Sequence, residues 1–156
     1  MLSPLQLGAL KRAAASAVLC ERATKIPAEL TVAQWALESG WGAHQPGNNC
    51  FGIKAYPGCF GIQSLETVEF VGGVRRVLLQ PFATFPSLDA CFAEHASLFS
   101  RAPYQKIFAA QSANPNLTRL ISQVSAVYAT DPNYSTLLLE IISMPAVTGA
   151  LALCRA

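Results

Sequence analysis

The stretch of sequence that most constrains the fold runs from Thr31 to Lys54. Apolar residues recur at spacings of three and four along its first part, which predicts a helix with one buried face. Two glycines follow, and glycine adopts the left-handed conformation of a helix C-terminus without steric cost, so we expect the helix to end near Gly40. Glu38 then lies in the last turn. The predicted buried face contains Leu30, Ala33, Leu37 and Trp41.

A second stripe of the same helix carries Glu38. We expect this stripe, which also contains Thr31 and Gln34, to face a cleft or solvent. The helix dipole disfavours a carboxylate at this end by about 0.3–1 kcal/mol, which raises the pKa by a fraction of a unit. Trp35 and Trp41 flank Glu38, and apolar surroundings raise a carboxyl pKa further. A raised pKa suits a general acid near neutral pH, whereas helix position alone favours an ordinary solvated glutamate.

The composition is that of one folded domain, which we expect to span residues 1–156. Apolar residues make up 52% and charged residues 13%, which excludes a disordered chain. A net charge of +2 is too small to indicate a nucleic-acid partner. No apolar run reaches the roughly 18–20 residues of a membrane span, so we expect no stable membrane insertion. The N-terminus lacks the basic and apolar segments of a signal peptide.

The stretch around Glu38 resembles the catalytic signature of bacterial glucosaminidases of glycoside hydrolase family 73. That family includes flagellar peptidoglycan hydrolases, autolysins and some phage lysins, and it is similar to endo-β-N-acetylglucosaminidases. Its pattern is Ala-Gln-x-x-Leu-Glu-Ser-Gly-Trp-Gly, followed by Asn-Asn-x-Phe-Gly-Ile-Lys, and the resemblance covers residues 15–142. The matching positions here are Ala33, Gln34, Leu37, Glu38, Ser39, Gly40, Trp41, Gly42, Asn48, Asn49, Phe51, Gly52, Ile53 and Lys54.

The resemblance implies an α+β fold that is mainly α, with a lysozyme-like helical lobe and a small β-hairpin lobe. It also implies hydrolysis of the β-1,4 bond after N-acetylglucosamine in a peptidoglycan glycan strand, with Glu38 protonating the leaving oxygen. No cofactor or metal is implied. We expect Tyr128 to contact the sugar or a catalytic water. The expected substrate-binding residues are Gln34, Trp41, Asn48, Asn49, Phe51, Lys54, Thr67 and Tyr134.

The segment from Leu65 to Phe82 is predicted to form a β-hairpin around a Gly72-Gly73 turn. The resemblance places a second catalytic carboxylate on this hairpin in a Thr-x-Glu context, which Glu69 matches, and Glu66 is the rival candidate. A two-residue turn also puts Glu69 opposite Arg76. An ion pair worth about 0.2–1 kcal/mol is therefore the alternative role for Glu69.

Helices account for most of the remaining chain. Ser3 and Ser87 are predicted N-caps, and Asp131 is predicted to cap the helix that follows it. We interpret His95 as structural or surface, because no nucleophile accompanies it. The apolar C-terminal tail from Met144 to Cys154 should pack on the core. The predicted helices cover residues 4–24, 87–101, 103–110, 117–127 and 132–143.

Cys50 and Cys59 bracket a short loop, and we predict a disulfide between them. Closing about ten residues would stabilise the fold by about 2.5–3 kcal/mol in the chain-entropy model. Such a bond fits an oxidising, extracytoplasmic setting such as the periplasm or the cell wall. Two reduced thiols are the alternative, and metal binding is a third. A phage-encoded lysin is the other localisation that the resemblance leaves open.

Two other functions stay open from the sequence. A muramidase or lytic transglycosylase would use Glu38 alone and cut the other glycosidic bond. A cell-wall-binding or assembly module would have lost catalysis altogether. The sequence also leaves open whether hydrolysis inverts, retains or uses the substrate's acetamido group, and we expect a monomer.

Overall fold

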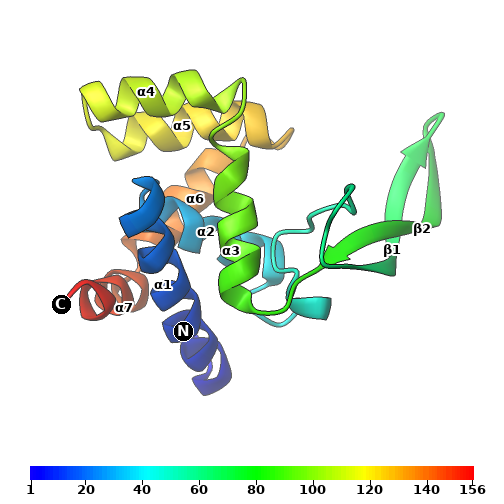
Figure 1. Cartoon of the computed structure of the whole chain (residues 1–156), viewed down its shortest axis with the longest axis horizontal. Helices are drawn as coiled ribbons and strands as arrows, with labels where there is room; N and C mark the ends of the chain where they lie inside the picture. Colours follow the sequence, from blue (N-terminus) through cyan, green and yellow to red (C-terminus); the bar gives the residue numbers. More distant parts are fainter.

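The computed structural model describes residues 1–156 apart from the side chains of residues 69–71 in the first strand. A helical lobe contains most of the chain, and a two-stranded hairpin extends away from it (Figure 1). The elements are α1 (Pro4–Thr24), α2 (Ala28–Ser39), the short 3-10 helix η1 (Pro46–Asn48), β1 (Gly61–Val71), β2 (Val74–Thr84), α3 (Leu88–Leu98), α4 (Tyr104–Ala113), α5 (Leu117–Tyr128), α6 (Tyr134–Ser143) and α7 (Pro145–Arg155).

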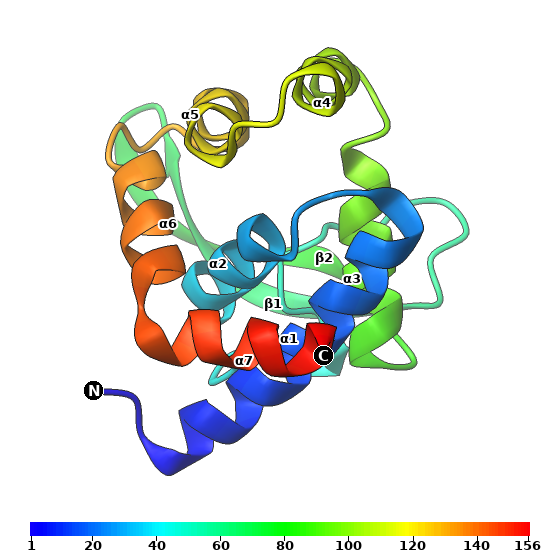
Figure 2. The same ribbon diagram turned by 90° about the vertical axis from the view of Figure 1, so that its left-hand side faces the viewer.

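Helix α2 lies in the middle of the helical lobe, with α1, α6 and α7 packed around it (Figure 2). Small side chains let the neighbours approach closely, since Ala28, Ala33 and Ala36 are almost completely buried. Trp35, in the centre of α2, is 1% exposed and is the largest of the fully buried side chains. The helix that carries Glu38 is therefore held by the core on most of its surface.

The end of α2 is fixed by backbone geometry that the sequence predicted. Gly40 adopts φ +58 and its N–H donates to the carbonyl of Ala36. Ser39 Oγ donates to the carbonyl of Trp35 at 2.6 Å and accepts from the N–H of Gly42 at 2.8 Å. A side chain at Gly42 would meet Trp35 Cζ2 at 3.1 Å, so glycine is required there. The chain consequently turns sharply just after Glu38.

The hairpin has the predicted turn and register, and its strands are longer than expected. Val71 pairs with Val74 and Glu69 with Arg76 across the antiparallel strands. Gly72 and Gly73 supply the positive φ values of the turn, +59 and +79. At the other end, the loop before β1 joins the sheet edge, because the N–H of Ala55 donates to Pro81 and the N–H of Ala83 donates to Ile53.

The C-terminal half differs from prediction at three helix ends, one of which is the end of α4 at Ala113 instead of residue 110. Helix α3 has the predicted Ser87 cap, with Oγ accepting from the N–H of Ala90, but it ends at Leu98. Asp131 does not cap α6, which begins at Tyr134. Instead, Asp131 Oδ1 accepts from the N–H of Asn133 at 2.8 Å, and its carbonyl accepts from the N–H of Tyr134 at 3.1 Å. The aspartate shapes a turn ahead of the helix, because the chain must first reverse direction after α5.

The tail after Met144 packs on the core as predicted, since Val147 and Leu151 of α7 are buried. Arg155 links α7 to α1 and α2 by binding two carboxylates, Glu21 and Glu29, at 2.7 Å each. Within the residues described, no single helix has the length and hydropathy needed to cross a bilayer, whereas the bent pair α6 and α7 meets both criteria when taken together.

Candidate active site

Glu38 lies where the central helix reaches the molecular surface. Its side chain is solvent-exposed, unlike those of its neighbours on α2. The hydroxyl of Tyr134, the first residue of α6, donates a hydrogen bond to Glu38 Oε1 at 3.0 Å. Tyr134 itself is buried, at 7% exposure. The carboxyl is thus held by a rigid partner from another helix while staying accessible.

The surroundings of Glu38 favour its neutral form. Desolvation by neighbouring protein atoms raises the pKa of this carboxyl, and the hydrogen bond from Tyr134 lowers it by a smaller amount. The net effect is a raised pKa, in the direction expected for a general acid. The carboxyl is therefore both accessible to solvent and partly desolvated by the protein atoms around it.

Two tyrosines form a stacked pair beside the carboxyl. The rings of Tyr128, at the end of α5, and Tyr134 lie 5.7 Å apart with an interplanar angle of 21°. Burial raises the pKa of both phenols, and the charge of Glu38 raises it further. Both hydroxyls therefore stay protonated at physiological pH. The turn built by Asp131 brings these two rings together.

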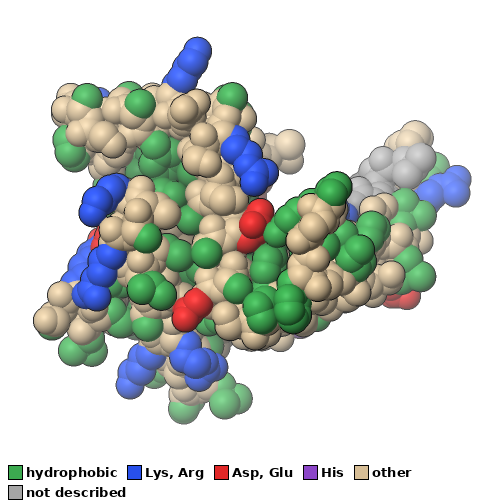
Figure 3. Space-filling view, viewed as in Figure 1, with side chains coloured by type: hydrophobic (Ala, Val, Ile, Leu, Met, Phe, Trp, Pro, Cys, Tyr) green, Lys and Arg blue, Asp and Glu red, His purple; other side chains and the backbone are tan. Residues whose placement is uncertain are grey.

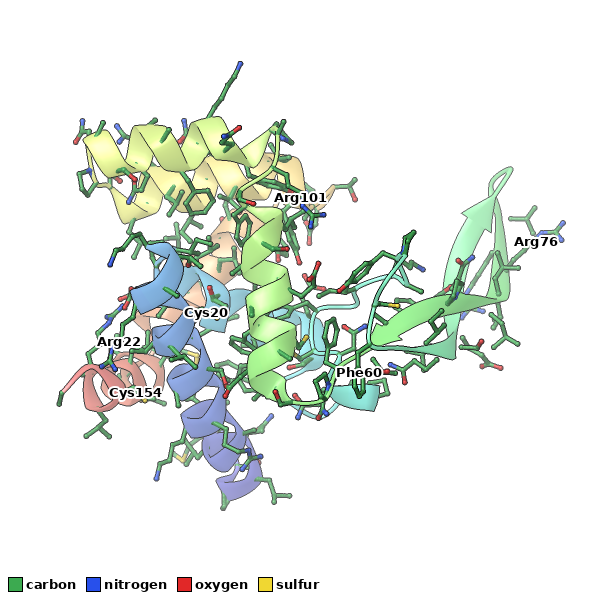
Figure 4. All side chains as sticks on the ribbon, in the orientation of Figure 1. Cys20, Arg22, Phe60, Arg76, Arg101 and Cys154 are labelled. Carbon is green, nitrogen blue, oxygen red and sulfur yellow. The ribbon has the colours of Figure 1, made fainter. Side chains whose placement is uncertain are left out.

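An open pocket of about 610 Å³ adjoins this tyrosine pair. It lies between α3 and the loop before β1, and Tyr128 belongs to its wall, whereas Glu38 lies outside its lining. Figure 3 shows acidic and basic side chains next to each other in the hollow between α3 and the hairpin side of the molecule. Arg101 extends beyond the end of α3 on the side of that loop (Figure 4) and lies 3.8 Å from Glu94. The aromatic members of the lining are Phe51, Tyr56, Tyr104 and Tyr128.

Gln34 does not reach this surface, so its prediction as a sugar contact is wrong. The residue is 0% exposed and Thr31 is 1% exposed, because α6 packs against the stripe of α2 that we expected to face a cleft. Gln34 Nε2 instead lies 3.4 Å from the hydroxyl of Tyr134. The structure therefore joins Gln34, Tyr134 and Glu38 in one hydrogen-bonded chain.

The side chains of both asparagines of the signature, Asn48 and Asn49, donate hydrogen bonds to backbone carbonyls around the loop that follows η1. Asn49 is 4% exposed, and its Nδ2 donates to the carbonyls of Ile53 at 2.8 Å and Ala83 at 2.9 Å. Its Oδ1 accepts from the N–H of Ile53 at 3.0 Å. The predicted substrate contact by Asn49 is thus wrong, since both ends of its buried amide are hydrogen-bonded within the protein. Asn48 is exposed, and its Nδ2 donates to the carbonyl of Phe85 at 2.9 Å.

Phe51 forms the floor of the pocket rather than an exposed platform. It is 5% exposed and its ring stacks on His95 with centroids 3.8 Å apart. His95 is 2% exposed, and burial lowers its pKa to about 3, so the ring is neutral. Of the two roles predicted for His95, structural or surface, the structure supports the structural one.

The remaining predicted contacts lie in three different places. Trp41 is half-buried, packs edge-on against Trp35 at 6.2 Å and borders a separate pocket beside α1. Lys54 Nζ lies 4.1 Å above the ring of Phe82. Thr67 Oγ1 is 3.4 Å from the carbonyl of Leu78 across the hairpin. Each of these three residues therefore has its own contacts within the protein, and their predicted role in binding the substrate stays a prediction.

The predicted second carboxylate lies on β1. The side chain of Glu69 is outside the described residues, so its catalytic role stays a prediction, as does its ion pair with Arg76. Glu66, the rival candidate, is exposed. The antiparallel register places the backbone of Glu66 opposite Leu79.

The predicted disulfide between Cys50 and Cys59 is absent, since all five cysteines are free. Cys50 is buried and its Sγ lies 3.5 Å from Sγ of Cys91 on α3. Cys59 is only partly buried, and its Sγ approaches the carbonyl of Gly61. Proximity in sequence was misleading, because the loop turns Cys50 toward the core. Among the described residues, no group of three His, Cys, Asp or Glu side chains could hold a metal ion.

Sequence reasoning missed the contribution of α3 to the pocket. Glu94, on α3, and Arg101, in the turn after this helix, both line the pocket. The sequence predicts the helix but does not say which segment its exposed side meets. The link between Gln34 and Tyr134 was also missed, because it joins two helices across the core.

The fold places the chain in a class that contains glycoside hydrolase domains. The glycoside hydrolase domain of FlgJ from Salmonella typhimurium superposes with a TM-score of 0.70 at 29% identity, covering 88% of this chain and 95% of that one. The catalytic domain of the autolysin Auto from Listeria monocytogenes has the same fold, with a TM-score of 0.81 at 22% identity over 96% of this chain and 89% of that one. The predicted fold, mainly α with a small hairpin, is confirmed.

The chain belongs to the glucosaminidase family, described as mannosyl-glycoprotein endo-beta-N-acetylglucosaminidase, whose model matches residues 14–145. The peptidoglycan hydrolase FlgJ of Salmonella typhimurium is 32% identical over 142 residues. That alignment covers 85% of this chain and 44% of the relative, so the chain spans less than half the length of this relative. The family predicted from the signature around Glu38 is thereby confirmed.

Proposed function

We propose that this protein is a peptidoglycan hydrolase that cleaves the β-1,4 bond after N-acetylglucosamine, with Glu38 as general acid. The observation that carries the proposal is the accessible Glu38 carboxyl, whose Oε1 accepts from Tyr134 at 3.0 Å and whose pKa is raised by desolvation. The similar FlgJ protein is named a peptidoglycan hydrolase, which supports the same substrate class for this chain. A glycan strand outside the cytoplasm is the corresponding partner.

Three residues, Glu38, Tyr134 and Glu69, have distinct roles in this proposal. Glu38 donates its proton to the oxygen of the departing sugar, which converts a poor leaving group into an alcohol. Tyr134 holds the carboxyl in place through its hydroxyl. Glu69, on the hairpin, then activates water or stabilises the positive charge that develops on the sugar ring.

The neighbouring pocket fits one part of the glycan strand in this proposal. Sugar rings have apolar faces and polar edges, so a site with aromatic walls and a few charged groups suits them. Tyr56 and Tyr128 supply aromatic surface, and Glu94 and Arg101 supply hydrogen-bonding groups at the rim. Tyr128 stacks on the same tyrosine that holds Glu38, so a strand in the pocket would pass close to the acid.

Mass spectrometry of digested peptidoglycan tests this proposal. Purified sacculi incubated with the protein should release fragments with new N-acetylglucosamine reducing ends. The Glu38→Gln variant should lose at least about a hundredfold of this activity, the scale of a lost acid–base group, while its circular dichroism spectrum is unchanged. Glu140→Gln, which makes the same chemical change on the exposed part of α6, should keep full activity.

Two results would contradict the proposal. Muramic-acid reducing ends or anhydro-muramic products would show that the other glycosidic bond is cut. Full activity of Glu38→Gln would remove Glu38 from the role of general acid.

A further inference from the structure

Gln34 is fully buried in α2, yet only half of its amide group has a partner. Its Nε2 donates to the hydroxyl of Tyr134 at 3.4 Å. Its Oε1 is buried and has no hydrogen-bond partner among the described residues. A buried acceptor without a partner destabilises a fold, and a catalytic role is one of the reasons for which such a group is retained. An apolar side chain of similar size would avoid this cost, so the glutamine calls for an explanation.

The position of Gln34 connects it to the proposed catalytic acid. Gln34 and Glu38 are four residues apart on α2 and therefore lie on the same face of the helix. The Tyr134 hydroxyl sits between them, accepting from Gln34 Nε2 and donating to Glu38 Oε1 at 3.0 Å. Tyr134 is buried, so few other groups can satisfy its hydroxyl.

A general acid changes protonation state in every catalytic cycle, and the hydroxyl beside it must adjust. When Glu38 is ionised, Tyr134 donates its proton to the carboxylate, and its oxygen lone pair needs a donor such as Gln34 Nε2. When Glu38 is protonated, the carboxyl can donate to Tyr134 instead. The phenol proton then needs an acceptor, and a half-turn of the Gln34 amide presents Oε1 in that position.

We propose that Gln34 is a positioning residue that keeps the Tyr134 hydroxyl against Glu38 in both protonation states of the acid. Glutamine suits this role because one side chain carries a donor and an acceptor. The proposal rests on the proposed function of Glu38, and it assigns Gln34 no contact with the substrate. The unpaired Oε1 is explained as the acceptor required by the other half of the cycle.

The first test compares Gln34→Met with the wild-type protein. Methionine has a similar volume but offers no strong donor or acceptor. We expect kcat to fall at least about fivefold with KM changed less than about twofold, while the melting temperature stays equal or rises, because a buried unpaired oxygen has been removed. Gln45→Met is the matched control, because among the described residues Gln45 also has a buried, unpaired Oε1 and has no hydrogen bond to Glu38.

The second test measures the pKa of Glu38 by carbon-13 NMR and does not depend on activity. A hydrogen bond to a carboxylate is stronger than one to a neutral carboxyl, so the Tyr134 hydroxyl lowers the pKa of Glu38 while Gln34 keeps it in position. Gln34→Met removes that support, and the pKa of Glu38 should therefore rise by at least about 0.3 units in the presence of Tyr134. In a Tyr134→Phe background the same substitution should have no effect on that pKa or on kcat. Equal effects in both backgrounds would overturn the proposal, because Gln34 would then act by another route.

A third measurement uses the wild-type protein, so it applies even if Gln34→Met does not fold. The side-chain amide resonances of Gln34 should shift with pH at the same midpoint as the Glu38 carboxyl. Resonances that stay constant through that titration would refute the proposed change of partner. If the protein cleaved no peptidoglycan, the proposed function would fail, while these NMR results would still decide the role of Gln34.

Discussion

The hydroxyl of Tyr134 donates to Glu38 Oε1 at 3.0 Å, although the two residues lie 96 positions apart in the chain. Their meeting depends on the packing of α6 against α2 and on the Asp131 turn that starts α6 at Tyr134. The hydrogen bond opposes the desolvation that raises the pKa of Glu38. Tyr134 therefore adjusts the acidity of Glu38 as well as its orientation.

Replacing Tyr134 with phenylalanine tests this adjustment. Because the hydroxyl lowers the pKa of Glu38, its removal should raise that pKa. A general acid works while protonated, so the alkaline limb of the kcat–pH profile should move to higher pH. We also expect kcat at the optimum to fall about tenfold, since the carboxyl loses its fixed partner. The measurements are a carbon-13 titration of Glu38 and the pH profile, and an unshifted limb would contradict the assignment.

Two matched substitutions distinguish the roles of the two hairpin carboxylates, Glu69 and Glu66. Glu69→Gln should lower the rate of peptidoglycan cleavage at least about tenfold, because this carboxylate activates water or stabilises charge in the proposed mechanism. Glu66→Gln should change it less than twofold, because the Thr-x-Glu context of the catalytic carboxylate matches Glu69 and not Glu66. The readout is the initial rate of release of soluble fragments. An unchanged rate for Glu69→Gln would favour the cross-strand ion pair with Arg76.

The ion pairs of Arg155 with Glu21 and Glu29 should make the free energy of unfolding depend on pH. Arg155 lowers the pKa of Glu29, so this carboxylate stabilises the fold above its unfolded pKa of about 4.3, and the contribution disappears as the pH falls through the lowered folded value. We expect Arg155→Ala to reduce the free energy of unfolding by about 1 kcal/mol at pH 7, since the groups are partly exposed.

Urea unfolding at pH 7 and pH 3 measures this effect. The difference between Arg155→Ala and the wild type should shrink at pH 3, and the exposed Arg12→Ala should show little change at either pH. A difference that stays constant with pH would show that Arg155 stabilises the protein through packing alone.

The cysteines should titrate as five free thiols in denaturant, because the structure contains no disulfide among them. In the native protein, the partly buried Cys59 and Cys154 should react with a thiol reagent first, and the buried Cys50 and Cys91 last. Ellman titration with and without guanidinium makes both measurements. Three thiols in denaturant would reveal one disulfide and contradict this structure.

Local features of this protein were predictable from its sequence, and features that depend on long-range packing were not. The end of α2 at Gly40 and the register of Val71 with Val74 were predictable, because each depends on residues a few positions apart. The partner of Cys50 and the start of α6 were not, since both depend on how distant segments pack. Gln34 illustrates the same limit: its helix was predicted correctly, and its environment was not.

The sequence by itself determined the family, the helix that carries Glu38, the glycine turn that follows and the hairpin. Local backbone preferences and a nearly contiguous signature are sufficient for these. Only the tertiary structure decided that Tyr134 holds Glu38, that Gln34 is buried beneath them and that α3 forms a wall of the neighbouring pocket. These features depend on which faces of separate helices meet, and that is set by packing of the whole core rather than by any one segment.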